Sequence, residues 1–175
     1  MDALLYLVAP FVVALLQVLP LGWVARLGRA GGALAFWLDA RHRRMAIRNL
    51  TMCFGAEKSP GELRALAKEN FRRIGENFAS AVKTSAMSPA ALRPRFDFVG
   101  AEKILKFEHD AGPQSRIVAI GHFGNFELYA RFGQFVPVFR CATTYRGLRQ
   151  PALNRLMQSL RERSGCQFFE RRTEA

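Results

Sequence analysis

The segment RIVAIGHFGNFELYAR, residues 116–131, constrains the fold most, because it combines the signals of a strand, a turn and a helix. Residues 116–120 are a short apolar run rich in β-branched side chains, which is typical of a buried parallel strand. From Asn125 to Phe135, apolar residues recur at helical spacing. The segment therefore predicts a strand that turns directly into a helix, with His122 in the turn.

His122 and Glu127 are the candidate reactive pair of this turn. On one continuous helix their side chains would point in different directions, but a histidine placed before the first helical turn escapes that restriction. We expect the Glu127 carboxylate to bind one imidazole nitrogen and fix the tautomer, while His122 takes a proton from a hydroxyl group. Gly124 leaves the approach open, and the helix N-terminus offers N–H groups to a developing oxyanion. The alternative is a histidine bound to a backbone carbonyl and a glutamate favoured only by the helix dipole.

The segments that follow continue the α/β pattern. Residues 137–144 form a predicted second strand, residues 151–164 a helix and residues 167–169 a third strand. The loop that starts at Tyr145 lies at a strand end, where ligands favour binding. Arg146 and Arg149 can hold phosphate groups there, although simple surface solvation is the alternative for both.

The N-terminal region is apolar and then basic. Residues 4–25 are long enough to cross a bilayer, but Pro10 and Pro20 interrupt them, so spanning and lying in the interface are equally open. The arginines that follow place the body of the protein in the cytoplasm by the positive-inside rule. Gly31 and Gly32 allow two helices to approach closely. We divide the chain into a hydrophobic membrane anchor region, 1–40, and the N-terminal part of an α/β domain, 41–175.

Four further helices and one strand are predicted before the central segment. Residues 41–54 form a basic helix that suits anionic headgroups, with a solvated charged face as the alternative. Ser59 and Glu62 form a capping box at the start of a long helix. Ser88 begins a short helix, residues 96–99 alternate like a strand, and residues 101–110 form an amphipathic helix.

Composition limits the partners. The chain has 175 residues and a formal net charge of +12, which indicates an anionic partner: a membrane surface, an acidic carrier protein or nucleic acid. Its three cysteines contain no CxxC pair, so neither a disulfide framework nor a zinc site is indicated. No metal and no cofactor is expected.

Several motifs resemble the lipid A biosynthesis acyltransferase family, the lauroyl and myristoyl transferases of the lysophospholipid acyltransferase-like superfamily with an H-x4-D/E motif. The matching segments are 121–127 (GHFGNFE), 144–146 (TYR), the basic helix 154–163, the N-terminal hydrophobic anchor and 44–50 (RMAIRNL). The resemblance implies that His122 and Glu127 are catalytic. It also implies substrate binding by Phe123, Gly124, Asn125, Tyr145, Arg146 and Arg149. Gly147 stands where many relatives have proline. Relatives continue past residue 175, so we expect a C-terminally truncated acyltransferase sheet.

The resemblance implies transfer of a fatty acyl chain from a thioester on acyl carrier protein to a hydroxyl of a lipid A precursor or related glycolipid. Attack is expected to be direct, because no G-x-S-x-G nucleophile elbow occurs. The expected location is the cytoplasmic side of a bacterial inner membrane. The alternatives are a lysophospholipid or other glycolipid acyltransferase that uses acyl-CoA, and a non-catalytic membrane-binding module. A nucleic-acid binder is least favoured, since no recognised nucleic-acid motif is present.

Overall fold

The computed structural model describes residues 2–100, 102–103, 115, 117–136 and 140–172. The chain forms two compact units, residues 1–83 and 84–175. Helices make up most of the first unit, and a parallel pair of strands lies in the second. This confirms a mixed α/β class. The predicted division at residue 40 falls at the junction of two helices, beside Asp39.

The first unit begins with two consecutive helices, α1 (Asp2–Val18) and α2 (Leu21–Leu38). The break between them lies at Pro20, whose fixed φ suits the residue before a helix and whose missing N–H cannot continue one. The long apolar run of the sequence is therefore divided between two helices. Among the helices described, none is both long and apolar enough to cross a bilayer.

Helices α3 (Ala40–Phe54) and α4 (Pro60–Ser85) complete this unit, with the last two residues of α4 in the second unit. The predicted basic helix corresponds to α3, which begins where Asp39 accepts a hydrogen bond from the His42 backbone N–H at 3.0 Å. The predicted capping box is confirmed at α4. The Ser59 N–H donates to Glu62 at 2.8 Å, and the Glu62 N–H donates to the Ser59 hydroxyl at 3.4 Å.

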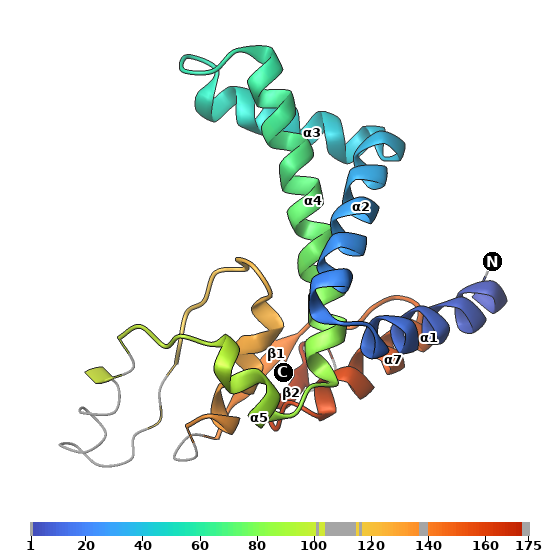
Figure 1. The fold of residues 1–175 in the computed structure, drawn as a ribbon, viewed down its shortest axis with the longest axis vertical. Helices are drawn as coiled ribbons and strands as arrows, with labels where there is room; N and C mark the ends of the chain where they lie inside the picture. The colour runs from blue at the N-terminus through green and yellow to red at the C-terminus, as the bar shows by residue number, and fades with distance from the viewer. Residues whose placement is uncertain (1, 101, 104–114, 116, 137–139, 173–175) are drawn as a thin grey trace. The chain divides into compact units, whose positions relative to one another are not determined.

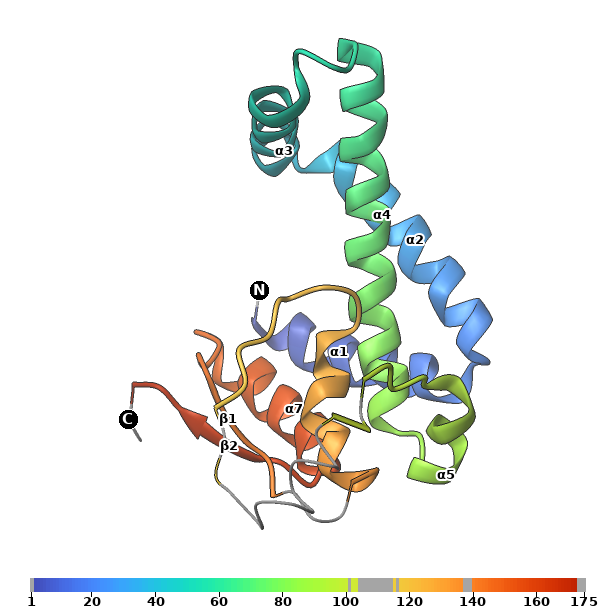
Figure 2. The ribbon, with the colours of Figure 1, turned by 90° about the vertical axis from the view of Figure 1, so that its left-hand side faces the viewer.

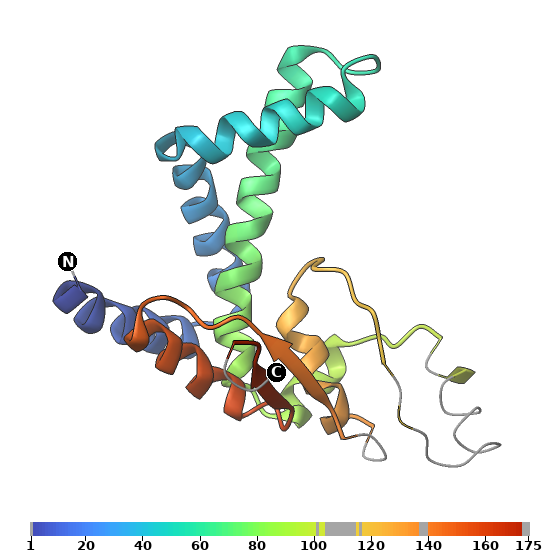
Figure 3. The ribbon, with the colours of Figure 1, turned by 180° about the vertical axis from the view of Figure 1, so that it is seen from behind.

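Glycines set the distance between α2 and α4, which lie alongside each other (Figure 1, Figure 3). A Cβ atom on Gly32 would lie 2.1 Å from the Phe71 carbonyl oxygen, and one on Gly75 would lie 2.2 Å from the Gly28 carbonyl oxygen. No side chain larger than hydrogen fits at either place without moving a backbone. The predicted close approach is thus found at Gly32, whereas Gly31 faces open space.

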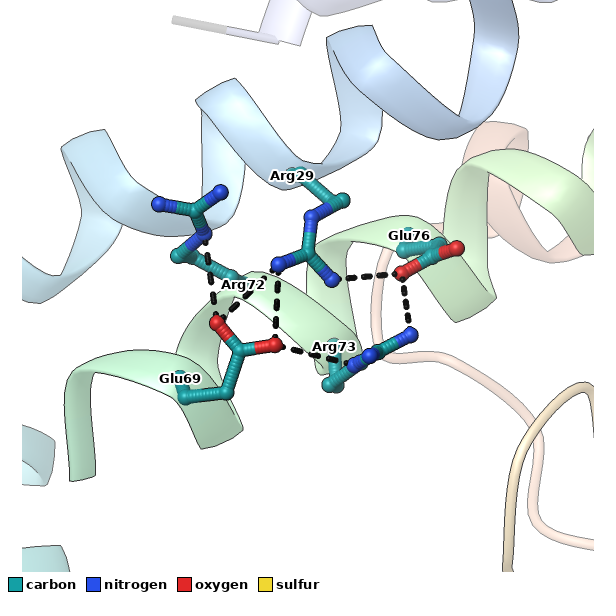
Figure 4. Close-up of polar contacts among 5 residues, drawn as sticks. All are labelled: Arg29, Glu69, Arg72, Arg73 and Glu76. Atoms are coloured by element: carbon teal, nitrogen blue, oxygen red, sulfur yellow. Dashed lines mark hydrogen bonds and ion pairs between the residues drawn. The ribbon is translucent and has the colours of Figure 1, made fainter. Parts of the chain in front are cut away.

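An ion-pair cluster joins the same two helices (Figure 4). Arg29 of α2 donates to Glu69 at 2.8 Å and to Glu76 at 3.0 Å, both on α4. Arg73 bridges the same two carboxylates. The hydrogen bond from Arg29, together with the charges of Arg29, Arg72 and Arg73, holds the pKa of Glu69 below its ordinary value. The core beside the cluster contains the buried side chains Val24, Phe36, Leu63 and Ala67.

The second unit contains α5 (Pro89–Leu92), the 3₁₀ helices η1 (Arg93–Arg95) and η2 (Phe126–Gln134), and a β–α–β segment. The β–α–β segment comprises β1 (Ala142–Tyr145), α7 (Pro151–Glu162) and β2 (Gln167–Glu170). The strands are parallel and pair Ala142 with Gln167 and Tyr145 with Glu170 (Figure 2). Ser88 caps α5 as predicted, accepting a hydrogen bond from the Ala91 N–H.

Two predicted strands are wrong. Residues 117–120 belong to no strand and are exposed, with Val118 73% accessible. Residues 96–98 are also outside any strand, and Phe96 and Phe98 pack against Phe135 instead. An alternating or apolar pattern produces a strand only where a neighbouring strand accepts its backbone hydrogen bonds. Arg116, residues 104–110 of the predicted amphipathic helix and residues 137–139 of the second predicted strand lie outside the described residues.

Candidate functional site

His122 lies in the extended segment just before η2. Its side chain is exposed, and its ring contacts the Phe126 ring with 4.6 Å between centroids. Phe123 is 83% exposed. Gly124 has a positive φ of 59°, which glycine adopts without strain, and a Cβ atom there would have open space around it. The turn therefore presents the imidazole to solvent with little bulk around it.

Helix η2 is fixed to the last turn of α4 and to the segment that follows it. Arg131 is 4% exposed, and its guanidinium donates to the Thr84 and Met87 carbonyl oxygens and to Gln134. Asn125 donates to the Thr84 hydroxyl at 3.0 Å. Burial lowers the pKa of Arg131. These bonds hold both ends of η2, so Asn125, predicted to bind substrate, also has a structural contact.

Glu127 lies in the first turn of η2 and binds Arg161 of α7. Arg161 Nε donates to one carboxylate oxygen at 3.0 Å and Nη2 donates to the other at 2.5 Å. Both side chains are partly buried, 22% and 18% exposed. This is a bidentate pair, the strongest geometry that arginine forms with a carboxylate.

The predicted hydrogen bond between Glu127 and His122 does not occur in the described part of the chain, where Glu127 pairs with Arg161 instead. A guanidinium carries a permanent charge and a planar fork of donors, so it binds the carboxylate better than a neutral imidazole does. His122 and Glu127 lie on either side of the same turn, but the acid holds α7 rather than the ring. Their predicted catalytic roles remain predictions.

Sequence analysis does not identify Arg161, because helical periodicity predicts an ordinary outward-facing arginine at this position. In the structure its guanidinium lies over the Tyr145 ring at 5.4 Å and the Phe168 ring at 5.3 Å. Such stacking stabilises a desolvated cation. The Tyr145 hydroxyl in turn accepts a hydrogen bond from Gln158. Arg161 therefore joins η2, β1 and β2, and nothing local in the sequence distinguishes it from its exposed neighbour Arg163.

The loop after β1 carries the two predicted phosphate-binding residues, Arg146 and Arg149, and both are exposed. Its backbone is fixed at two points. The Gly147 N–H donates to Glu170 at 3.0 Å, and the Leu148 N–H donates to Asn154 at 3.0 Å. The loop is thus held by side chains from β2 and α7.

Cys166, directly before β2, is a poor candidate for nucleophilic chemistry. Burial, with a smaller effect of Cys141, raises the pKa of Cys166 to about 11. A thiol with such a pKa is almost entirely protonated at neutral pH and is a poor nucleophile. Within the described segments, no three His, Cys, Asp or Glu side chains gather as a metal site would require.

Comparison of the chain with known protein families agrees with the motifs. The family model for bacterial lipid A biosynthesis acyltransferases matches residues 2–174. No curated protein and no solved structure matches the chain. Since the family model covers nearly every residue, including the turn with His122 and the bound Glu127, this chain belongs to the bacterial lipid A biosynthesis acyltransferase family, whose members are acyltransferase enzymes.

Proposed function

We propose that the protein transfers a fatty acyl group from a thioester on acyl carrier protein to a hydroxyl group of a lipid A precursor. Family membership supports acyl transfer in lipid A biosynthesis. The observation that carries the more specific proposal is the exposed His122 imidazole, placed in an open turn directly before η2.

In the proposed reaction, His122 accepts the proton of the acceptor hydroxyl as its oxygen attacks the thioester carbon. The new C–O bond forms, the C–S bond breaks, and the departing thiolate takes the proton back from the imidazolium. Gly124 leaves room for the acceptor. Direct attack fits the high pKa of Cys166, which removes that thiol as a covalent intermediate.

The structure changes the role that we assign to Glu127. Its charge is matched by Arg161, so the pair holds the first turn of η2 against α7. This keeps the residues beside His122 at a fixed place without giving the ring a charged partner in the resting protein. We propose that Glu127 acts by positioning the turn and by placing its carboxylate within the site as the imidazolium forms.

The exposed arginines of the β1–α7 loop suit the anionic parts of both substrates. Arg146 and Arg149 are free to bind a phosphate on the acceptor or the phosphopantetheine of the donor. Acyl-CoA carries the same phosphopantetheine, so it is the alternative donor, and a lysophospholipid or another glycolipid is the alternative acceptor. Assays with both donors and each acceptor separate these choices.

We further propose that the protein acts at the cytoplasmic surface of a bacterial inner membrane. Support comes from large apolar side chains that are exposed on α1 and α2, among them Phe11, Val18, Trp23 and Leu34. A membrane-binding module without catalysis would carry the same side chains. The acyltransferase and the membrane-binding module differ only in whether acyl transfer accompanies membrane binding.

The deciding experiment is His122→Ala in the complete protein, assayed with acyl carrier protein thioester and a lipid A precursor. Loss of a positioned general base is expected to lower kcat by about 10²–10⁴-fold. Vesicle binding is expected to remain, since His122 belongs to the second unit and the apolar helices to the first. Val118→Ala, at an exposed residue of the segment that precedes the turn, is the matched control for disturbance of this segment. Unchanged turnover by His122→Ala contradicts the mechanism.

A further inference from the structure

Helix α3 has an exposed face with an unusual composition. Its residues Arg41, Arg44, Met45, Arg48 and Met52 follow a spacing of three, four, seven and eleven, which places them on one side of a helix. All five are exposed, Met45 at 52% and Met52 at 75%. We name these five residues the Arg–Met face. No residue of α3 is buried.

The arginines of this face differ from the fourth arginine of α3. Arg43 turns back to α2, where it donates to the Phe36 and Trp37 carbonyl oxygens at 2.7 Å and lies over the Phe36 ring. It thereby caps the C-terminus of α2. Arg41, Arg44 and Arg48 have no hydrogen bond or ion pair to any other described side chain, and α3 contains no Asp or Glu. Their charge is uncompensated.

We propose that the Arg–Met face docks α3 on the anionic headgroups of a bilayer, with the two methionines in contact with the acyl chains. Three unpaired arginines supply charge complementary to acidic lipids. Methionine is apolar, unbranched and flexible, so it adapts to an irregular, fluid partner. Basic residues mixed with exposed apolar ones along a helix are the pattern of a helix that lies in a membrane interface.

A second observation favours a bilayer over an acidic protein. The outer side of α2 carries an exposed apolar stripe that ends directly before α3: Trp23, Leu27, Leu34, Trp37 and Leu38. Arg64 and Lys68 lie over the Trp37 ring at 5.6 and 5.7 Å. Tryptophan beside cations is typical of membrane–water interfaces. A carrier protein would explain the arginines but not this long apolar stripe.

The proposal rests on the proposed membrane location but not on the catalytic mechanism. It adds that recognition of anionic lipid belongs to α3, in addition to the apolar N-terminal helices. Acyl transfer to a detergent-dispersed acceptor is therefore expected to be unchanged when the Arg–Met face is altered. His122→Ala is expected to bind vesicles as the unaltered protein does. The catalytic proposal and the membrane-docking proposal can therefore be tested separately, and failure of one does not prevent a test of the other.

The test is sedimentation of the complete protein with vesicles of phosphatidylcholine alone or with phosphatidylglycerol added. The variant R41Q/R44Q/R48Q is expected to bind the anionic vesicles about 100-fold more weakly, from roughly a five-fold contribution per arginine near the surface. Its binding to neutral vesicles is expected to be unchanged. The matched control is R95Q/R171Q/R172Q, which removes the same charge from exposed arginines elsewhere and is expected to retain binding. Equal losses in both variants would mean that only net charge matters and would overturn the proposal.

Three further measurements complete the test. R41K/R44K/R48K keeps the charge and is expected to retain binding, which guards against a folding defect in the glutamine variant. Added salt is expected to weaken binding of the unaltered protein to anionic vesicles. M45Q/M52Q is expected to weaken binding to both kinds of vesicle several-fold. If M45Q/M52Q binds normally, or if R41Q/R44Q/R48Q loses affinity for an acidic carrier protein and retains it for vesicles, the bilayer is the wrong partner.

Discussion

Two arginine–glutamate sites in this protein use the same chemistry in different ways. In the first unit, Glu69 receives hydrogen bonds from Arg29 and Arg73 and lies 3.4 Å from Arg72, so its charge has several partners. In the second unit, Glu127 pairs with one arginine among the described residues, Arg161, which is stacked on two aromatic rings. The first site shares its charge and is partly exposed to water. The second depends on one bidentate contact between two partly buried side chains.

This difference indicates which site tolerates change. A surface network screened by water contributes little per pair, whereas removal of one partner from a buried pair leaves an uncompensated charge. In the first unit the close contact between α2 and α4 comes from glycine rather than from charge. In the second unit the pair joins the first turn of η2 to α7, while Gln134 at the other end of η2 donates to the Arg163 carbonyl oxygen at the end of α7. Substitutions can therefore test whether one unit is held by shape and the other by charge.

The largest effect is expected from Arg161→Met. Loss of the guanidinium frees Glu127 and the first turn of η2, so kcat is expected to fall about 10²-fold, the lower end of what a positioned base contributes. Arg163→Met, on an exposed arginine of the same segment, is the control and is expected to be near normal. Steady-state kinetics and thermal melts measure both.

The double variant E127Q/R161M sharpens this result. Removing both charges abolishes the penalty of an unpaired carboxylate, so its melting temperature is expected to exceed that of Arg161→Met. Its activity is expected to stay low if Glu127 also acts in the reaction. Recovery of activity along with stability would reduce the pair to a structural contact.

Gly32→Ala is expected to have the next largest effect, on stability. Its Cβ atom would lie 2.1 Å from the Phe71 carbonyl oxygen, so α2 and α4 must separate. Overpacking of this kind costs about 1–3 kcal/mol in the free energy of unfolding. Gly31→Ala, where nothing lies within 4 Å, is the control, and helix propensity alone predicts a gain of up to about 1 kcal/mol. Urea unfolding of the two variants compares them; equal effects would contradict the role given to shape.

The smallest effect is expected from acid titration of the Glu69 cluster. Hydrogen bonds from Arg29 hold the folded-state pKa of Glu69 below its ordinary value of 4.5. The stabilisation is thus fully present above pH 4.5 and is lost as pH falls through the lower folded-state pKa. In Glu69→Gln, the urea midpoint is expected to depend less on pH in this range. The loss of stability caused by Glu69→Gln is expected to be smaller than that caused by Gly32→Ala. A loss as large as that for Gly32→Ala would show that charge holds the helix pair after all.

The sequence by itself determined the elements whose signals are local. The capping box of Ser59 and Glu62, the cap at Ser88, the basic helix α3, helix α7 and strand β2 all depend on residues within a few positions of one another. The caps form hydrogen bonds within one helical turn, and the helices and the strand show in the periodicity of their side chains. Such elements can be predicted without knowing which distant segment they contact. The motif around His122 could also be recognised from its consecutive residues, and the family match supports the family that the motif suggested.

Only the tertiary structure decided which groups meet across the chain. Arg161 lies 34 residues from Glu127, and Arg131 lies 47 residues from the Thr84 carbonyl that it binds. Neither spacing belongs to a helical or strand period, and each arginine looks like an ordinary charged helix residue in the sequence. Residues 117–120 fail as a strand for the same reason: a strand needs a partner that local sequence cannot supply. Contacts between distant segments depend on how packed elements bring them together, and that is a property of the folded chain.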